Sequence, residues 1–416
     1  MTMDFETAQA LHDVAMADDR VQAAEAFKRH LTRLSDWRVV YADDSAASRL
    51  QTRRCKFPVE GCASSLFRGT SLWLIDADVA QRRQAAAFFC GAGTYLDSNA
   101  ASVIRSIAYH EQPAPELLAK GRMLGEFVGL GVTANPFLYL WESQRHWTGK
   151  TIERCRQAFA ANHALGLART LPDLAWGRQF RAAQRQEAEA VADAYLADFQ
   201  RQLDSGLGCE INEIVELIEA VLTRAKFLEY SSRKSPQHKL NELIRFMHEE
   251  LSTIMTRELI VCADILGTAP QSRLSQKLKG VRNGADPFAL LRNCAWDLFL
   301  PRALDMLAGA DPVDGLDFYL PHIITFDADV ADILRLTELR AVALHRESRA
   351  VYPYFDIDPA AWLSGQVGEK RSAALEPLFG ATAYGQRQGR RDGADVRRIL
   401  ASDRVRLQAL LDGVRT

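Results

Sequence analysis

Five acidic residues in the 416-residue chain have the type and spacing that metal-assisted chemistry needs. Asp97 follows an apolar stretch in TYLDSN (94–99), and Asp327 and Asp329 follow another in IITFDAD (323–329). An apolar strand that runs directly into carboxylates at a turn places those acids at the carboxyl end of the strand. Because such strand ends share one edge of an open parallel sheet, we expect the three acids to converge.

Glu142 and Asp297 stand in segments with helical spacing, next to Trp141 and Trp296. A carboxylate on a mostly buried helix face is costly unless it is paired, hydrogen-bonded or bound to a metal. Several converging acids repel one another, and a divalent cation relieves that repulsion. Carboxylate oxygens favour Mg²⁺ or Mn²⁺ over zinc. Such an ion activates water and stabilises the charge that develops on a phosphodiester, so we expect phosphate-ester hydrolysis.

Structural roles are the alternative for each acid. The acids at the strand ends have the position of helix N-caps, which are common in any α/β protein. For Glu142 the alternative is an ion pair with Arg145 or a place on the helix surface. For Asp297 it is a salt bridge with Arg292 or Arg302.

The elements that must position these residues follow from the hydrophobic pattern. Helical spacing covers 4–35, 81–89, 116–128, most of 150–266 and 286–307; strands are expected at 37–42, 71–76 and 341–345. Pro301 predicts a break or kink in its helix, because proline lacks the backbone donor. The pattern thus predicts a mixed α/β protein with a long helical middle.

The acidic segments, in this order, resemble the PIN-domain nucleases, a family that includes the ribonuclease toxins of bacterial toxin–antitoxin pairs. That family starts with a strand ending in a D-[ST]-N turn, which Asp97-Ser98-Asn99 matches. A glutamate in the next helix is matched by NPFLYLWE, and an aspartate in a later helix by CAWDLF. A final T-x-[DN]-x-D pattern is matched from Thr325 to Asp329.

The resemblance implies a role for each matched residue and one or two Mg²⁺ or Mn²⁺ ions as cofactor. The implied metal ligands are Asp97, Glu142, Asp297 and Asp327. Asp329 would complete the acidic pocket. Asn99 and Thr325 would orient the acids through hydrogen bonds.

The fold class implied by the resemblance is α/β: a PIN-like three-layer α/β/α core with a parallel sheet, a large helical insertion and an α+β N-terminal segment. We divide the chain into an N-terminal segment (1–90), a first PIN-like part (91–150), the insertion (151–239), a second PIN-like part (240–350) and a basic tail region (351–416). Compact toxin-type PIN domains lack such an insertion.

Composition limits the partners. The formal net charge is −2, so no global basic field marks a nucleic-acid binder, although local basic clusters occur at 53–56 and 387–398. The seven cysteines have no C-x-x-C spacing, which argues against a zinc site or a disulfide framework. The N-terminus does not resemble a signal peptide, and no apolar stretch reaches the roughly 18 residues of a membrane span. We therefore expect a cytoplasmic protein without a membrane partner.

The predicted function is an Mg²⁺- or Mn²⁺-dependent nuclease, an endoribonuclease that hydrolyses phosphodiester bonds with a metal-activated water. RNA is favoured over DNA, and a toxin-like role is suggested, by the resemblance alone. A protein inhibitor or a second copy of the chain remains open as partner. The alternative from another class is a non-catalytic helical interaction protein with a degenerate PIN-like core. The D-x-D of FDADV also suggests a phosphatase, but a matching lysine motif is missing.

Overall fold

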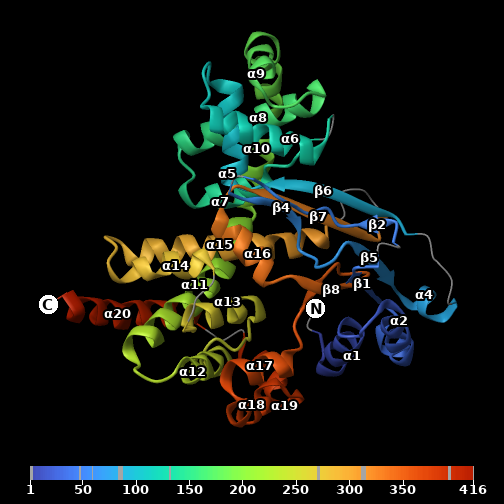
Figure 1. Ribbon diagram of the computed structural model, residues 1–416, viewed down its shortest axis with the longest axis vertical. Coiled ribbons are helices and arrows are strands. Elements are labelled where there is room, and N and C mark those ends of the chain that lie inside the picture. Colours follow the sequence, from blue (N-terminus) through green and yellow to red (C-terminus); the bar gives the residue numbers. More distant parts are fainter. Residues whose placement is uncertain are drawn as a thin grey trace.

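The computed structural model describes residues 3–45, 48–58, 60–82, 88–130, 133–268, 272–310, 315–391 and 395–415. Two small sheets lie in its middle (Figure 1). Sheet A has the order β2-β5-β1-β8-β9 and sheet B the order β3-β4-β7-β6. The strands are β1 (Trp37–Asp43), β2 (Leu50–Gln51), β3 (Cys55–Lys56), β4 (Cys62–Ser65), β5 (Ser71–Ile75), β6 (Cys90–Leu96), β7 (Phe318–Thr325), β8 (Leu339–His345) and β9 (Val351–Phe355).

The pairing in sheet B differs from the expected parallel sheet. Among the described strands, only β6 and β7 run parallel, with Leu96 opposite Ile324. On the other side of β7, strand β4 runs antiparallel, with Cys62 opposite Thr325. Every described pair in sheet A is antiparallel as well. The protein is therefore mixed α/β with two small sheets, and the parallel arrangement is confined to the two strands that carry the strand-end acids.

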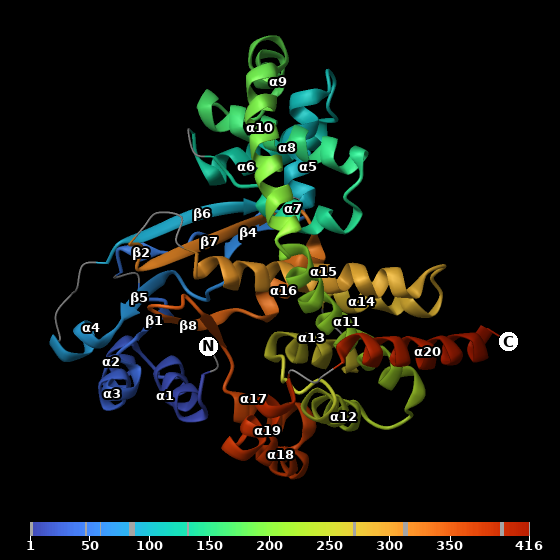
Figure 2. The ribbon, with the colours of Figure 1, turned by 180° about the vertical axis from the view of Figure 1, so that it is seen from behind.

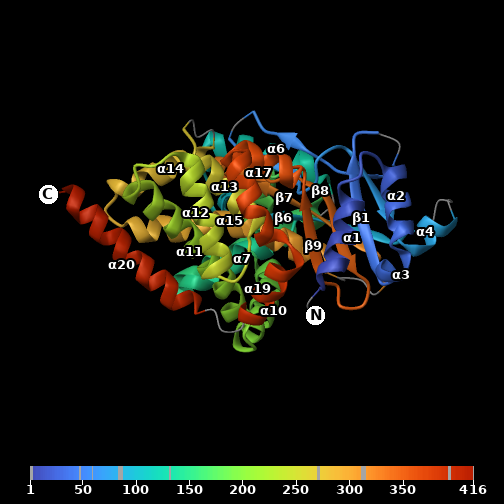
Figure 3. The same cartoon turned by 90° about the horizontal axis from the view of Figure 1, so that it is seen from below.

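The N-terminal segment builds part of both sheets. Its strand β1 lies between β5 and β8, and its strand β4 pairs with β7. The helical spacing over 4–35 forms α1 (Phe5–Ala15), α2 (Arg20–Arg29) and α3 (Leu31–Leu34). Leu11 and Phe27 of these helices pack with Val39 and Tyr41 in a separate hydrophobic cluster. This cluster covers the outer face of sheet A, at the opposite end of the molecule from the C-terminal helix (Figure 3).

A lobe of helices stands on sheet B in both ribbon views (Figures 1 and 2). It contains α5 (Ser98–Tyr109), α6 (Pro115–Val128), α8 (Gly149–Ala168), α9 (Leu174–Gln179) and α10 (Arg185–Asp204), with the short α7 (Phe137–Ser143) at its base. A π-helical turn at Phe180–Gln184 joins α9 to α10. Helix α5 follows β6 directly and also contacts α8. The lobe is therefore anchored on the strand that carries Asp97.

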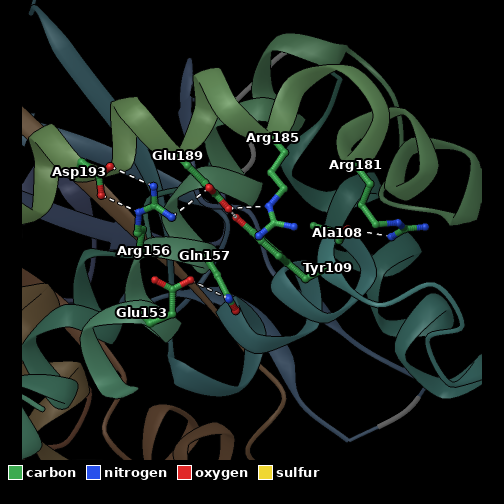
Figure 4. A network of polar contacts seen from close by, with 9 residues as sticks. All are labelled: Ala108, Tyr109, Glu153, Arg156, Gln157, Arg181, Arg185, Glu189 and Asp193. Carbon is green, nitrogen blue, oxygen red and sulfur yellow. Dashed lines mark hydrogen bonds and ion pairs between the residues drawn. The ribbon is translucent and has the colours of Figure 1, made fainter. Parts of the chain in front are cut away.

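Polar contacts fasten α8 and α10 of this lobe to α5 (Figure 4). The carboxylate of Glu189 accepts a hydrogen bond from the Tyr109 hydroxyl at 2.8 Å and pairs with Arg185 at 2.8 Å and Arg156 at 2.9 Å. Arg156 also forms a forked pair with Asp193. One partly buried carboxylate thus joins three helices.

On the other side of sheet B, helices from the second half of the chain form the larger body. They are α11 (Leu207–Ser231), α12 (Pro236–Glu249), α13 (Thr256–Leu266), α14 (Arg273–Leu278), α15 (Pro287–Ala308) and α16 (Ala328–Leu336). Of the break or kink predicted at Pro301, the break is wrong, because α15 continues through this buried proline. Both α15 and α16 contact β7. In Figures 1 and 2 they lie below sheet B while α5 lies above it.

The C-terminal region is helical, with α17 (Pro359–Val367), α18 (Glu369–Leu375), α19 (Ala381–Arg391) and α20 (Val396–Arg415). Helix α20 packs along α11, where Arg404 pairs with the buried Glu219. Of the predicted helix over 81–89, α4 (Ala77–Arg82) contains the first residues, and 83–87 lie outside the described residues. Within the described ranges, no helix combines the length and apolar character that crossing a bilayer requires.

Candidate functional site

Asp97 stands at the junction between β6 and α5. The strand ends with the buried residues Tyr95 and Leu96, so the next side chain is delivered into the interior, where Asp97 is 1% exposed. One carboxylate oxygen accepts a hydrogen bond from the backbone N–H of Ala100 at 2.7 Å. Asp97 therefore is the helix N-cap that the structural alternative predicted, and it is also fully buried.

Thr325 connects the two strand ends. It is the last residue of β7, and the parallel register brings it beside Asp97. Its hydroxyl donates a hydrogen bond to the second carboxylate oxygen of Asp97 and accepts one from the backbone N–H of Asp327 at 2.9 Å. Gly61, with a φ of 113°, allows β4 to approach here, since an added Cβ would lie 2.2 Å from the Thr325 carbonyl oxygen. Thr325 has the orienting position that the resemblance implies.

Asp327 and Asp329 lie at the start of α16. Asp327 is the N-cap of that helix and accepts a hydrogen bond from the N–H of Asp329 at 2.8 Å. The side-chain amide of Asn99 donates to the other oxygen of Asp327 at 3.3 Å. Asn99 thus links the start of α5 to Asp327, on the facing strand end, rather than to its neighbour Asp97.

Glu142 reaches the same place from α7. Its side chain accepts a hydrogen bond from Ser98, and Arg145 is the cation nearest to it among the described residues, at 4.0 Å. Burial raises the pKa of Glu142, the Ser98 hydrogen bond and Arg145 lower it, and the charge of Asp327 raises it again. Glu142 therefore forms the ion pair with Arg145 that we considered as its structural alternative, although the distance of 4.0 Å is long. It also lies close enough to Asp327 for that charge to raise its pKa.

Asp297 lies on α15 and pairs with a residue that we did not predict. The Lys277 ammonium, from α14, lies 2.8 Å from Asp297 and 2.8 Å from Asp329. The partners suggested for Asp297, Arg292 and Arg302, are engaged elsewhere: Arg292 with Glu219 and Asn212, and Arg302 with Glu258. No short-range motif in the sequence links Lys277 to either of its two acids, which come from later segments.

Mutual electrostatic effects show that the acids share one environment. Burial raises the pKa of Asp97 to about 7, hydrogen bonds from Thr325 and Ala100 lower it, and the charges of Glu142 and Asp327 raise it. Burial likewise raises the pKa of Asp297 to about 7, against the lowering effect of Lys277, and the same two charges add to the increase. Asp97, Glu142, Asp297 and Asp327 therefore influence one another, and Asp329 joins this cluster through the Lys277 ammonium that it shares with Asp297.

Lys277 supplies positive charge to this cluster. Burial lowers the pKa of its ammonium, but the charge of Asp297 and hydrogen bonds to Asp297 and Asp329 outweigh burial and raise it above its ordinary value. The ammonium is therefore charged at neutral pH, and it neutralises one unit of the negative charge of the acids.

The donor set suits a hard divalent cation, because every group at its centre is a carboxylate. The raised pKa values of Asp97 and Asp297 also indicate acids that gain from a cation nearby. Within the part of the chain that the structure describes, no three His, Cys, Asp or Glu side chains are arranged to hold a metal ion. The chemistry of these acids thus fits Mg²⁺ or Mn²⁺, while in this arrangement Asp297 and Asp329 pair with Lys277.

Comparison with known proteins does not assign this chain to a family. No family model matches the chain, and the searches of curated proteins and of solved structures also find no match.

Proposed function

We propose that the protein is a metal-dependent nuclease with a PIN-like core, which hydrolyses phosphodiester bonds at the Asp97 cluster. The supporting observation is the convergence of five acids from four separate segments at the ends of β6 and β7. Helix capping explains Asp97 and Asp327 individually. It does not explain why the carboxylates of Glu142 and Asp297, from two other helices, both lie close enough to Asp327 for its charge to raise their pKa.

The residues of the cluster have separate tasks in this proposal. The candidate ligands of Mg²⁺ or Mn²⁺ are Asp97, Glu142, Asp297 and Asp327. When bound, the ion would act as a Lewis acid on the phosphate and lower the pKa of a water molecule. Thr325 holds Asp97 in one rotamer through its hydroxyl, and Asn99 does the same for Asp327. No side-chain nucleophile is required.

Two lysines beside the cluster support a nucleic-acid substrate. Lys56 is exposed on β3, in register with Cys62 on β4, which in turn lies opposite Thr325. The ammonium of Lys120, on α6, lies 5.6 Å from the ring centroid of Phe326 and pairs with the exposed Glu116. Positive charge next to an acidic cluster can hold the phosphates on either side of the cleaved bond. The preference for RNA rests on the PIN resemblance.

The compartment that we propose is the one expected from the sequence. All seven cysteines are free thiols in the structure, which agrees with a reducing compartment. We propose a cytoplasmic protein on this basis.

The test is cleavage of labelled single-stranded RNA and DNA by the purified protein with Mn²⁺, with EDTA, and with Asp97→Asn. The amide oxygen of asparagine can still accept the Ala100 N–H, so this variant keeps the cap while it removes the charge. Asp173→Asn is the matched control, because Asp173 caps α9 in the same way, accepting from Trp176 at 2.8 Å in the helical lobe. We expect cleavage that needs Mn²⁺, is retained in Asp173→Asn and is lost in Asp97→Asn. Equal cleavage by Asp97→Asn would contradict the assignment.

A non-catalytic interaction protein with a degenerate core is the second candidate. Two observations favour it. Lys277 already neutralises part of the negative charge of the cluster. In addition, no three His, Cys, Asp or Glu side chains among the described residues are arranged to hold a metal ion. Thermal unfolding separates the two candidates, because an ion that binds the folded state stabilises it by mass action. A melting temperature that does not respond to Mn²⁺, together with no cleavage, would favour the degenerate protein.

A further inference from the structure

Lys277 forms its two ion pairs with residues of two other helices. It comes from α14, but its ammonium pairs with Asp297 on α15 and Asp329 at the start of α16, each at 2.8 Å. Its side chain is 33% exposed, so the two contacts are made at the rim of the cluster rather than in open solvent. Lys277 therefore joins three helices at the place where the acids meet.

The contacts of Lys277 are those of a cation held by two carboxylates. An ammonium has three N–H donors, and two of them are directed at Asp297 and Asp329. The distance of 2.8 Å is that of a charge-assisted hydrogen bond. Without this positive charge, two carboxylates that both lie within hydrogen-bonding distance of one point would repel each other.

The other half of the cluster lacks such a partner. Among the described residues, no lysine or arginine forms an ion pair with Asp97 or Asp327, and the guanidinium of Arg145 lies 4.0 Å from the carboxylate of Glu142. Asp97 and Asp327 are held instead by neutral donors, Thr325 and Asn99. The negative charge that still needs a counter-ion is therefore on the side of Asp97, Glu142 and Asp327.

From this division we infer that Lys277 is a resident counter-ion that fills the place of a second cation, so that the site takes one divalent ion, on the side of Asp97, Glu142 and Asp327. The inference rests on the proposed function. Sites with two metal ions hold them about 3.5–4 Å apart and need carboxylates for both. Here Lys277 pairs with Asp329 and with Asp297, one of the four candidate ligands, and its charge repels a further cation. The inference therefore leaves Asp97, Glu142 and Asp327 as the ligands of the single ion. Lys277 is thus a residue that sets the number of ions.

The test is the stoichiometry of Mn²⁺ binding, measured by titration calorimetry on the full chain. We expect one ion for the parent protein and for Lys277→Arg, which keeps the charge. For Lys277→Met, which keeps the length of the side chain but loses the charge, we expect two ions. One ion in Lys277→Met, or two in the parent protein, would overturn the inference.

A second measurement avoids any dependence on the folding of the variants. The electron paramagnetic resonance spectrum of the parent protein with excess Mn²⁺ should show an isolated ion. A spectrum broadened by coupling between two neighbouring ions would refute the role of Lys277 while the nuclease proposal stands. If the parent protein binds no Mn²⁺ and cleaves no nucleic acid, the proposed function itself fails, and this inference fails with it.

Discussion

Thr325 and Asp97 lie side by side at the ends of two parallel strands, and the buried Thr325 hydroxyl donates a hydrogen bond to the Asp97 carboxylate. The same hydroxyl accepts the backbone N–H of Asp327. One oxygen atom therefore connects the two strand ends and fixes the distance between two candidate ligands.

Thr325→Val should remove the hydrogen bonds that link the two strand ends, while valine keeps the shape of the threonine side chain. It leaves one Asp97 oxygen and the Asp327 N–H without their partner, and an unsatisfied buried polar group costs about 1–3 kcal/mol. Thr325→Ser keeps the hydroxyl and is the control. The free energy of unfolding in urea, measured with EDTA present, should fall for valine and stay close to the parent value for serine. Equal values for the two variants would contradict the role of the hydroxyl.

The stability of the metal-free protein should depend on pH through Asp97 and Asp297. Their pKa values in the folded state are about 7, whereas an unfolded aspartate titrates near 3.9. Between about pH 4 and 7 the folded state therefore keeps protons that the unfolded state releases, so these groups lower the free energy of unfolding as the pH rises. With EDTA present, the parent protein should lose stability over this range relative to a variant with both Asp97→Asn and Asp297→Asn.

Mn²⁺ should show the opposite dependence on pH, because the ion binds the deprotonated carboxylates. The affinity for Mn²⁺, measured by calorimetry, should rise between pH 6 and 8, near the raised pKa of Asp97. An affinity that is constant over this range would mean that Asp97 is not a ligand, or that its pKa is not raised.

Lys56 and Lys120 should contribute to binding of nucleic acid through phosphate contacts. Each of Lys56→Gln and Lys120→Gln, made in the inactive Asp97→Asn protein, should weaken binding of single-stranded RNA and lower the slope of log affinity against log salt by about 1. Lys28→Gln is the control, because Lys28 is exposed on α2, beside sheet A. Fluorescence anisotropy over a range of salt concentrations measures the slope. An equal effect of all three variants would indicate general electrostatics rather than a binding track.

Glu189 should couple the helical lobe to α5. Glu189→Gln removes the charge that Arg156, Arg185 and the Tyr109 hydroxyl share. We expect faster amide hydrogen exchange in α5, α8 and α10, and unchanged Mn²⁺ binding. Asp193→Asn is the control, since that carboxylate is 55% exposed and exposed ion pairs contribute little. Exchange that increases equally in both variants would contradict a special role for Glu189.

Arg257 and Asp305 should form a buried ion pair whose disruption strongly destabilises the protein. Arg257 is 1% and Asp305 5% exposed, and they form two hydrogen bonds, of 2.6 and 3.1 Å, between α13 and α15. Asp305→Leu leaves a buried guanidinium without its partner and should cost about 3–5 kcal/mol. The double variant with Arg257→Met should cost less than Asp305→Leu alone, and urea denaturation measures both. Additive losses would mean that the two charges act independently.

Local sequence was sufficient for the parts of the site that depend on chain neighbours. The apolar runs before Asp97 and before Asp327 predict strands, and their polar turns predict the caps that begin α5 and α16. Amphipathic spacing predicted the helices of the middle region. The break that proline chemistry allowed at Pro301 does not occur, because packing of α15 in the core keeps the helix continuous although proline removes one backbone donor.

Tertiary structure decided the contacts between segments that are distant in the chain. The short strand β4 contains two serines and has no strand pattern of its own, yet it completes sheet B because β7 offers its free edge and Gly61 allows close approach. Lys277 was not predicted, because its partners Asp297 and Asp329 come from two later elements. Sequence by itself determined which residues are acids at strand ends and on helices, since hydrophobic periodicity is local. Which charge faces which acid depends on how the helices pack around β7, and only the three-dimensional arrangement specifies that.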